Sequence, residues 1–335
     1  MATAMIGTPA ILPVSHFLLQ RLLGVGGTMP EPRKYKVMIA FFSYGGNGGM
    51  MSEHPDVRDW LVRTLATAKN DRRISETTVV ELADTPITMC RNKAVLDARE
   101  LGVDILVMID SDQSPDCEPG APAWWDTAFD FLDSMYDTHP VVIGAPYCGP
   151  PPMESVYVFR WQNCATNNVD ECDMQLKAFT RYEAALQAGT RPVGALPTGL
   201  IMYDMRVFDL IDPTPRYRQL RDLGLTSSEA ARACPKWFDY EWKNQFGSEK
   251  GSTEDVLNTR DLSLVGIQKY GRNPVYCTWD CWAGHWKPKL VRKPQILSAD
   301  SVSRSLADVV LRGNESGLRI EQVSFKDDSM LAEVV

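Results

Sequence analysis

The residues ILVMI at positions 105–109 are five consecutive apolar residues with no polar residue among them. Successive side chains of a β-strand point to opposite faces of its sheet, so this stretch predicts a strand that is buried on both faces. Such strands are typical of a parallel sheet that is covered by helices on either side. The strand ends directly on two carboxylates, Asp110 and Asp112, which raises the question of why acidic residues follow a buried run.

Apolar runs and helically spaced segments alternate throughout residues 34–148, in the order β-α-β-α-β-α-β. This order indicates an α/β fold with a mostly parallel, doubly wound, Rossmann-like sheet. Ligands in that architecture bind outside the carboxyl ends of the strands, so we expect Asp110 and Asp112 at the mouth of a ligand crevice. The predicted strands are 34–44, 76–83, 104–110 and 140–147, and the predicted helices are 54–70, 85–102 and 122–137.

The alternation stops after residue 148, where an irregular polar region begins. The elements predicted beyond it are a helix within 174–189, a strand-turn-strand-helix unit over 192–211, a capped helix over 252–271 and a strand over 274–288. From this organisation we expect three parts, namely an N-terminal extension at 1–33, a main domain at 34–290 and a C-terminal tail at 291–335.

Composition narrows the classes of partner. The net charge of −8 and the isoelectric point near 5.2 argue against a broad nucleic-acid surface, which would have to be basic. The eight cysteines are too few for a disulfide scaffold, and we find no ordered signal peptide, so we expect a cytoplasmic protein with reduced thiols. The apolar segment 4–27 contains prolines, Gln20 and Arg21, which makes it too interrupted for a membrane span.

The pair Asp110 and Asp112 has two interpretations. Carboxylates at positions i and i+2 of a turn can share one divalent cation, and oxygen ligands suit Mn²⁺ or Mg²⁺ together with the phosphates of a substrate. The substrate would then be a conjugate of a nucleoside diphosphate. Alternatively, the two aspartates only cap a loop and the next helix, as aspartates often do.

Three later features bear on this choice. Gly199 precedes an apolar strand, where a bare backbone could approach a sugar or a phosphate; a simple tight turn is the competing explanation. Glu254 and Asp255 open a helix, where they also serve as helix-capping charges. His285 lies near the end of the main domain, and a lone histidine is usually structural.

Taken in this order, the four features resemble the signature of GT-A-type nucleotide-sugar glycosyltransferases over about residues 34–288. The resemblance implies a GT-A-type fold with a nucleotide-binding half, 34–148, and a smaller antiparallel acceptor-side half, 149–290. It implies transfer of a sugar from a UDP- or GDP-linked donor to a hydroxyl acceptor that the sequence does not identify. We favour inversion at the anomeric carbon, because the adjacent acidic pair supplies a base opposite the leaving group.

The resemblance also implies roles for single residues on the donor side. Asp110, Asp112 and His285 would form the site for Mn²⁺ or Mg²⁺, with Asp112 and His285 as ligands and Asp110 against the ribose or a metal-bound water. Gly199 would line the donor sugar and the acceptor. Such a cation would neutralise the charge that develops on the diphosphate leaving group.

On the acceptor side, Asp255 would be the general base that deprotonates the attacking hydroxyl, and Glu254 would orient the acceptor. Further contacts are predicted from position alone. The basic residues Arg91 and Lys287 are candidate phosphate contacts, although Arg91 could equally be an exposed helix residue. The end of the first strand is expected to hold the nucleobase, through Phe41, Ser43 and Tyr44.

Other functions remain open at this stage. A nucleotidyltransferase, or a nucleotide-sugar-binding protein without turnover, would share the α/β layout and the metal-binding carboxylates. Cys277, Cys281 and His285 are zinc-type ligands, but on one strand they would extend over roughly 25 Å, too far for one ion. The aromatic residues around Trp237 would suit either sugar stacking or core packing.

Overall fold

The computed structural model describes residues 33–43, 54–83, 87–149, 154–161, 176–211, 237–239, 253–287, 289–291, 320–326 and 329–334. The chain divides between Arg33 and Lys34, and the elements below all lie after this boundary. The predicted roles for Tyr44 and for the N-terminal extension fall outside the described residues. The division of the main domain into two functional halves stays a prediction.

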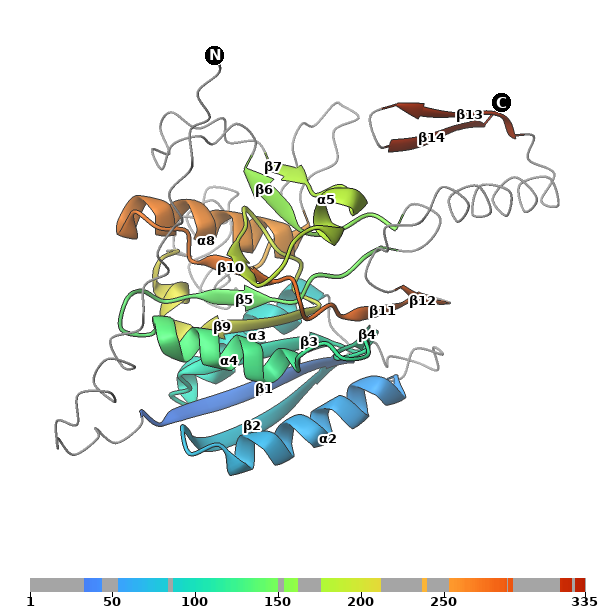
Figure 1. Cartoon of the computed structure of the whole chain (residues 1–335). Helices are drawn as coiled ribbons and strands as arrows, with labels where there is room; N and C mark the ends of the chain where they lie inside the picture. The colour runs from blue at the N-terminus through green and yellow to red at the C-terminus, as the bar shows by residue number, and fades with distance from the viewer. Residues whose placement is uncertain are drawn as a thin grey trace, which may run out of the picture. The chain divides into compact units, whose positions relative to one another are not determined.

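A central sheet of seven strands forms the framework, in the order β2-β1-β3-β9-β5-β10-β8 (Figure 1). Five of these strands run in the same direction, while β9 and β8 run against them. The predicted α/β fold with a mostly parallel sheet is therefore confirmed. The strands are β1 Tyr35–Ser43, β2 Ile74–Ala83, β3 Ile105–Asp110, β5 Val142–Gly144, β8 Thr190–Pro192, β9 Leu200–Asp204 and β10 Val275–Thr278.

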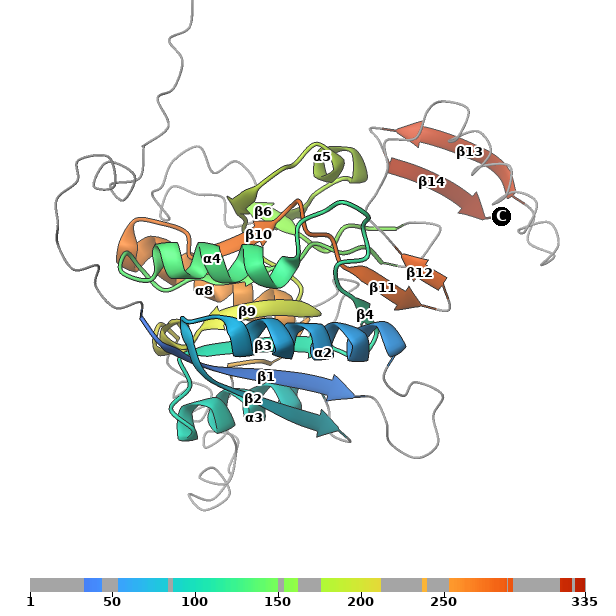
Figure 2. The same ribbon diagram turned by 60° about the horizontal axis from the view of Figure 1, so that its bottom comes forward.

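Helices cover both faces of this sheet, as expected for a doubly wound fold. One core lies between the sheet and the helices α2 and α4, and it includes Val107 of β3. The other contains residues of α3 and α8 together with Met108 of the same strand. Figure 2 shows α2 and α4 on the same side of the sheet. The helices are α2 Pro55–Asn70, α3 Ile87–Glu100, α4 Trp124–Met135 and α8 Glu254–Tyr270.

Local signals place the helix ends well. Pro55 opens α2, where its missing N–H is not needed. Gly102 follows α3 with φ of +63°, a left-handed conformation that glycine adopts without strain, so the predicted stop at this residue is confirmed. Gly271 ends α8 in the same way, with φ of +63°.

The predicted helix within 174–189 is wrong in its first half. Leu176–Ala178 is strand β7, which pairs with β6 Phe159–Trp161, and α5 covers Arg181–Ala185 alone. The cause is a capping box: the Thr180 hydroxyl accepts a bond from the backbone of Glu183 at 3.1 Å, and Glu183 accepts one from the backbone of Thr180 at 2.9 Å. This pair fixes the start of the helix later in the chain.

Small antiparallel sheets complete the described fold. The strands β4 Gln113–Ser114, β11 Gly284–Lys287 and β12 Lys289–Val291 form one of them, and this sheet carries two predicted site residues. In the tail, β13 Ile320–Lys326 pairs with β14 Ser329–Val334, although no element was predicted there. Among the described helices, none combines the length and the apolar character needed to cross a membrane.

Candidate functional site

The turn that carries Asp110 and Asp112 is held by three neighbouring strands. The backbone N–H of Asp110 donates to the carbonyl of Gly199 at 2.9 Å, and that of Ser111 donates to Phe42 of β1 at 3.0 Å. Trp286 of β11 donates its N–H to the carbonyl of Asp112 at 2.7 Å. The turn therefore lies at the carboxyl end of β3, where ligands are expected in a sheet of this kind.

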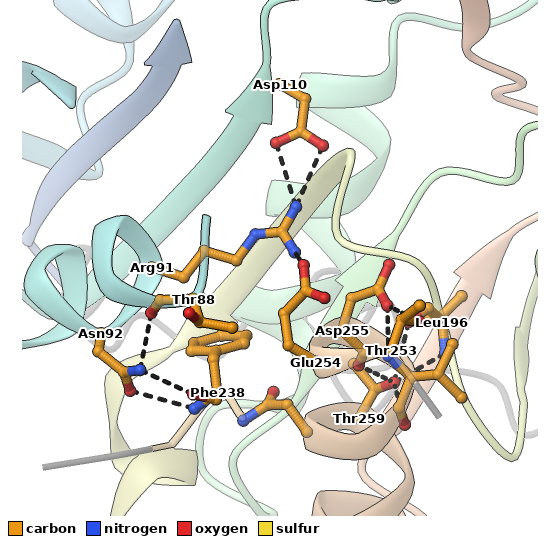
Figure 3. Close-up of polar contacts among 12 residues, drawn as sticks. Thr88, Arg91, Asn92, Asp110, Leu196, Phe238, Thr253, Glu254, Asp255 and Thr259 are labelled. Carbon is orange, nitrogen blue, oxygen red and sulfur yellow. Dashed lines mark hydrogen bonds and ion pairs between the residues drawn. The ribbon is translucent and has the colours of Figure 1, made fainter. Parts of the chain in front are cut away.

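Arg91 joins this turn to the first turn of α8 (Figure 3). Its Nη2 lies 3.2 and 3.1 Å from the two carboxylate oxygens of Asp110, and its Nη1 pairs with Glu254. The alternative of an exposed helix arginine is wrong, because Arg91 is 3% exposed. The predicted phosphate contact stays a prediction, and both terminal nitrogens of Arg91 already pair with carboxylates.

Acidic side chains outnumber basic ones among the described residues of this site. Burial raises the pKa of Asp110, and although Arg91 lowers it, the nearby charges of Asp112 and Asp255 raise it further. Burial also raises the pKa of Glu254 above its ordinary value, against the opposite effect of Arg91. For Arg91, burial alone would lower the pKa, but the surrounding carboxylates raise it. Among the described residues, Arg91 pairs with two of the four carboxylates gathered here, a setting that suits a cationic ligand.

Asp112 and His285 form a pair whose geometry suits a cation. The Nδ1 atom of His285 lies 3.0 Å from the carbonyl of Cys148, and because a carbonyl can only accept, Nδ1 carries the proton. In the neutral ring, Nε2 then presents a lone pair to an Asp112 oxygen 3.2 Å away. Two acceptors that face each other require a cation or a proton between them. Metal-binding histidines are commonly oriented by such a carbonyl.

The predicted ligand set of Asp110, Asp112 and His285 does not assemble as a group of three. No cluster of three or more His, Cys, Asp or Glu side chains within the described ranges could hold a metal ion, and the oxygens of Asp110 face Arg91. Asp112 and His285 remain as a two-residue set. This set fits Mn²⁺ or Mg²⁺ only where substrate phosphates and water fill the other positions, as is common for Mg²⁺.

The zinc interpretation is wrong. Cys277 and Cys281 belong to different cores, on opposite faces of the sheet. Within the described residues, no group of three or more His, Cys, Asp or Glu side chains is placed to hold a metal ion, and His285 faces Asp112 and not a cysteine.

Asp255 differs from its neighbour Glu254 in access and in bonding. Its Oδ1 accepts bonds from the Thr253 hydroxyl and from the Val256 backbone, the latter at 2.8 Å. Its Oδ2 has no hydrogen-bond partner among the residues described, and the side chain is half-buried. Glu254, in contrast, is buried against Arg91. Asp255 is therefore the more accessible of the two carboxylates.

Gly199 lies against two side chains of the chain itself, and its role in lining the donor sugar stays a prediction. A Cβ atom at this position would lie 2.6 Å from Nε2 of Gln113 and 2.8 Å from a ring carbon of Tyr147. The space beside the bare backbone is thus filled by the chain's own side chains. Tyr147, which the sequence interpretation missed, also packs edge-on against His285 at a ring distance of 4.9 Å. Its position three residues beyond the end of β5 was the available signal.

Asn92, the residue after Arg91, was also missed. Its side-chain nitrogen donates to the carbonyls of Thr88 and Phe238 at 2.7 and 2.8 Å, and its oxygen accepts from the backbones of Trp237 and Phe238 at 2.7 and 3.1 Å (Figure 3). These bonds anchor an aromatic segment from far along the chain. Trp237 is 4% exposed, so core packing, and not sugar stacking, explains its place.

Most of the residues predicted to contact the nucleobase and the phosphates either contact other parts of the chain or lie outside the described residues. Phe41 is buried in the core that contains α2 and α4. The hydroxyl of Ser43 donates to Glu81 of the edge strand β2 at 2.8 Å. The backbone of Lys287 ends β11, but its side chain lies outside the described part of the chain.

No protein-family model matches this sequence, and no curated protein matches it. Solved structures with some similarity include A197 from STIV, with 12% identity over 78% of this chain and 96% of that chain and a TM-score of 0.41. A putative glucose-1-phosphate thymidylyltransferase from Bacillus anthracis has 10% identity over 88% of this chain and 98% of that chain, with a TM-score of 0.34. UDP-glucose pyrophosphorylase complexed with UDP-glucose has 10% identity over 53% and 78%, with a TM-score of 0.31. These scores are low, so the function proposed below is argued from the residues.

Proposed function

We propose that this protein is a metal-dependent glycosyltransferase that moves a sugar from a UDP- or GDP-linked donor to a hydroxyl acceptor. One observation carries the proposal. At the carboxyl end of the parallel strands, the pair Asp110 and Asp112 meets the pair Glu254 and Asp255 through Arg91. Transfer from a nucleoside diphosphate needs a cation at the leaving group and a base at the attacking hydroxyl, and the two acidic pairs offer one function each.

Asp112 and His285 are the residues that would hold Mn²⁺ or Mg²⁺, which when bound supplies charge neutralisation to the diphosphate. The carbonyl of Cys148 fixes the ring of His285 with its Nε2 toward Asp112. Asp110, held by Arg91, is left to accept a hydrogen bond from the ribose or from water. This assignment keeps the predicted role of Asp110 while removing it from direct ligation.

Glu254 and Asp255, the acidic pair at the start of α8, differ in the catalytic roles that they can take. Glu254 is buried and its charge is paired with Arg91, so it is poorly placed to receive a proton from an acceptor. Asp255 keeps one oxygen without a partner among the described residues and is partly open to solvent. We therefore assign the base to Asp255 and assign to Glu254 the task of orienting the acceptor side of the site. A base on this side supports inversion.

The test is a thermal-shift screen of UDP-, GDP-, ADP- and TDP-sugars, each with and without Mn²⁺, since a ligand that binds the folded state raises its stability. We expect one nucleotide class to stabilise the chain in a metal-dependent manner. The products of that donor then separate the alternatives. A released nucleoside diphosphate supports the transferase, pyrophosphate chemistry indicates a nucleotidyltransferase, and binding without products indicates a non-catalytic protein. No shift with any donor would overturn the proposal.

A retained anomeric configuration in the product, measured by NMR, would remove inversion and with it the assignment of Asp255 as the base. The metal assignment does not depend on that result, because the leaving group is the same in both stereochemical courses.

A further inference from the structure

A group of buried polar side chains adjoins the carboxylates around Gly199. Gln113 follows Asp112 directly, and Thr198 precedes Gly199; both side chains are 0% exposed. Among the residues the structure describes, neither amide atom of Gln113 has a hydrogen-bond partner, and neither does the hydroxyl of Thr198. Native proteins leave few buried polar groups unpaired, and each one needs an explanation.

Packing brings this group to the edge of the candidate site. The Gln113 amide and the Tyr147 ring both approach the bare Cα of Gly199, within 2.6 and 2.8 Å of the place where a Cβ would lie. The Tyr147 hydroxyl is close enough to Asp110, Asp112 and Asp255 to interact with their charges. The same tyrosine packs on His285. Gln113 is also the cross-strand partner of His285, so the unpaired amide belongs to a residue that adjoins the candidate metal pair.

The chemistry of the unpaired atoms indicates a kind of ligand. An amide offers an acceptor and a donor side by side, and a threonine hydroxyl can act as either. Adjacent hydroxyl groups on a sugar ring offer the matching donors and acceptors. An apolar side chain of the same shape as Gln113 would pack in this place without leaving an amide unpaired, so the amide is informative.

We propose that Gln113 and Thr198, together with Tyr147, form a subsite for adjacent hydroxyl groups of the transferred sugar, and that Gln113 is a specificity-determining residue. This rests on the proposed function, because the sugar enters as part of the nucleotide donor. The nucleoside diphosphate binds elsewhere in the site, so the subsite adds only the affinity of the sugar. Since both side chains are closed off from solvent, binding requires movement of the side chains that pack on Gly199.

The variant Gln113→Met in the full chain tests this proposal, because methionine has nearly the same shape and no amide. Calorimetric affinities are measured with Mn²⁺ for UDP and UDP-glucose, and for GDP and GDP-mannose. We expect Gln113→Met to bind the nucleoside diphosphate as the wild type does and to lose about tenfold in affinity for the matching sugar nucleotide, the size expected for one or two lost hydrogen bonds. Gln187→Met, which removes an amide from α5's end, is the matched control and should change neither affinity.

An equal loss for the diphosphate and for the sugar nucleotide would overturn the subsite, as would no loss for either. If Gln113→Met does not fold, Thr198→Val is measured instead with the same two outcomes. If the wild-type chain binds UDP or GDP but binds the matching sugar nucleotide no more tightly, the subsite proposal is overturned and the proposed function is not. Wild-type chain that binds none of the four ligands defeats the proposed function itself.

Discussion

Two arginine–aspartate pairs lie at opposite ends of β3, and the two arginines differ in burial. At the amino-terminal end of β3, Arg206 pairs with the buried Asp204, stacks on the ring of Tyr136 and donates to that residue's carbonyl at 2.8 Å. The side chain of this arginine is 41% exposed. At the other end, the buried Arg91 meets Asp110 and Glu254, and the charges of Asp112 and Asp255 are close enough to Asp110 to raise its pKa. A pair whose arginine reaches solvent can serve structure alone, whereas four carboxylates gathered around one buried arginine suit a cationic ligand.

The largest difference in stability is expected between the two variants that each lack one arginine. Arg91→Met leaves Asp110 and Glu254 buried without a counter-charge, which typically destabilises a protein by about 3–5 kcal/mol. Arg206→Met should destabilise by roughly 1–2 kcal/mol, because the buried Asp204 keeps its hydrogen bond from the backbone N–H of residue 206 at 3.0 Å and water can reach the place of a side chain that is 41% exposed. Urea denaturation of the ligand-free variants measures both free energies of unfolding.

The control for this comparison removes the stranded charges as well. Adding Asp110→Asn and Glu254→Gln to Arg91→Met should recover most of the lost stability, since no buried carboxylate then lacks a partner. Equal losses in Arg91→Met and Arg206→Met would show that the burial of Arg91 with its carboxylates has no energetic consequence in the ligand-free chain.

The next effect concerns the cation. Saturating Mn²⁺ should stabilise the wild-type chain, by about 2.7 kcal/mol at one hundred times its dissociation constant, because Asp112 and His285 lie 3.2 Å apart with Nε2 facing the carboxylate. Asp112→Ala should abolish this gain, as seen by thermal unfolding with and without Mn²⁺. Asp59→Ala on the exposed face of α2 is the charge-matched control and should keep the gain. Wild-type chain that Mn²⁺ leaves unchanged would reduce the His285–Asp112 contact to an ion pair.

Much of the framework could be predicted because it depends on local sequence. The run ILVMI is buried on both faces as its composition predicts, and Gly102 ends α3 as its conformational freedom predicts. The reversed strand β9, between β3 and β5, could not be predicted, because strand direction is set by tertiary pairing. Strand β7 was mistaken for helix because Thr180 delays the start of α5.

The parts of the site formed by residues adjacent in the sequence could be predicted, and the parts that depend on contacts between distant residues could not. The two acidic pairs were identified from their spacing, and Arg91 links one member of each. The partners of Asn92 lie 145 and 146 residues away, so nothing near Asn92 in the sequence signals its anchoring role. The unpaired amide of Gln113 likewise becomes visible only when its neighbours are known.

A smaller effect is expected in the pH dependence of stability. Carboxyls in the unfolded chain titrate near a pKa of about 4, whereas burial raises the pKa of Asp110 and of Glu254 in the fold. The folded chain then binds protons more tightly, so these groups make stability fall as the pH rises from about 4 through the raised pKa values. Glu254→Gln should remove part of this fall, measured as the difference in unfolding free energy between variant and wild type at each pH.

Two other titrating residues, His139 and Glu183, show why this difference reports on Glu254. The lowered pKa of the buried His139 reduces stability as the pH falls below about 6.5, but it does so in both proteins and cancels. In Glu183, hydrogen bonds from Thr180 and Arg160 outweigh burial and lower the pKa, so its stabilising contribution is present above about pH 4 and is lost in acid. Glu183→Gln should therefore lose stability at neutral pH, opposite in sign to Glu254→Gln. The same sign for both variants would contradict the raised pKa of Glu254.

The smallest effect on stability separates two threonines that precede helices. The Thr180 hydroxyl accepts from the backbone of Glu183 and caps α5, so Thr180→Ala should cost about 1 kcal/mol and leave activity unchanged. The Thr253 hydroxyl instead donates to Asp255 and makes no capping bond to α8. Thr253→Ala should therefore change stability by less than Thr180→Ala, yet it should slow donor turnover severalfold because the carboxylate of Asp255 loses its orienting bond. Donor turnover rates and urea denaturation of both variants test these two roles. If Thr253→Ala turns over the donor as fast as Thr180→Ala does, the position of Asp255 does not govern the reaction.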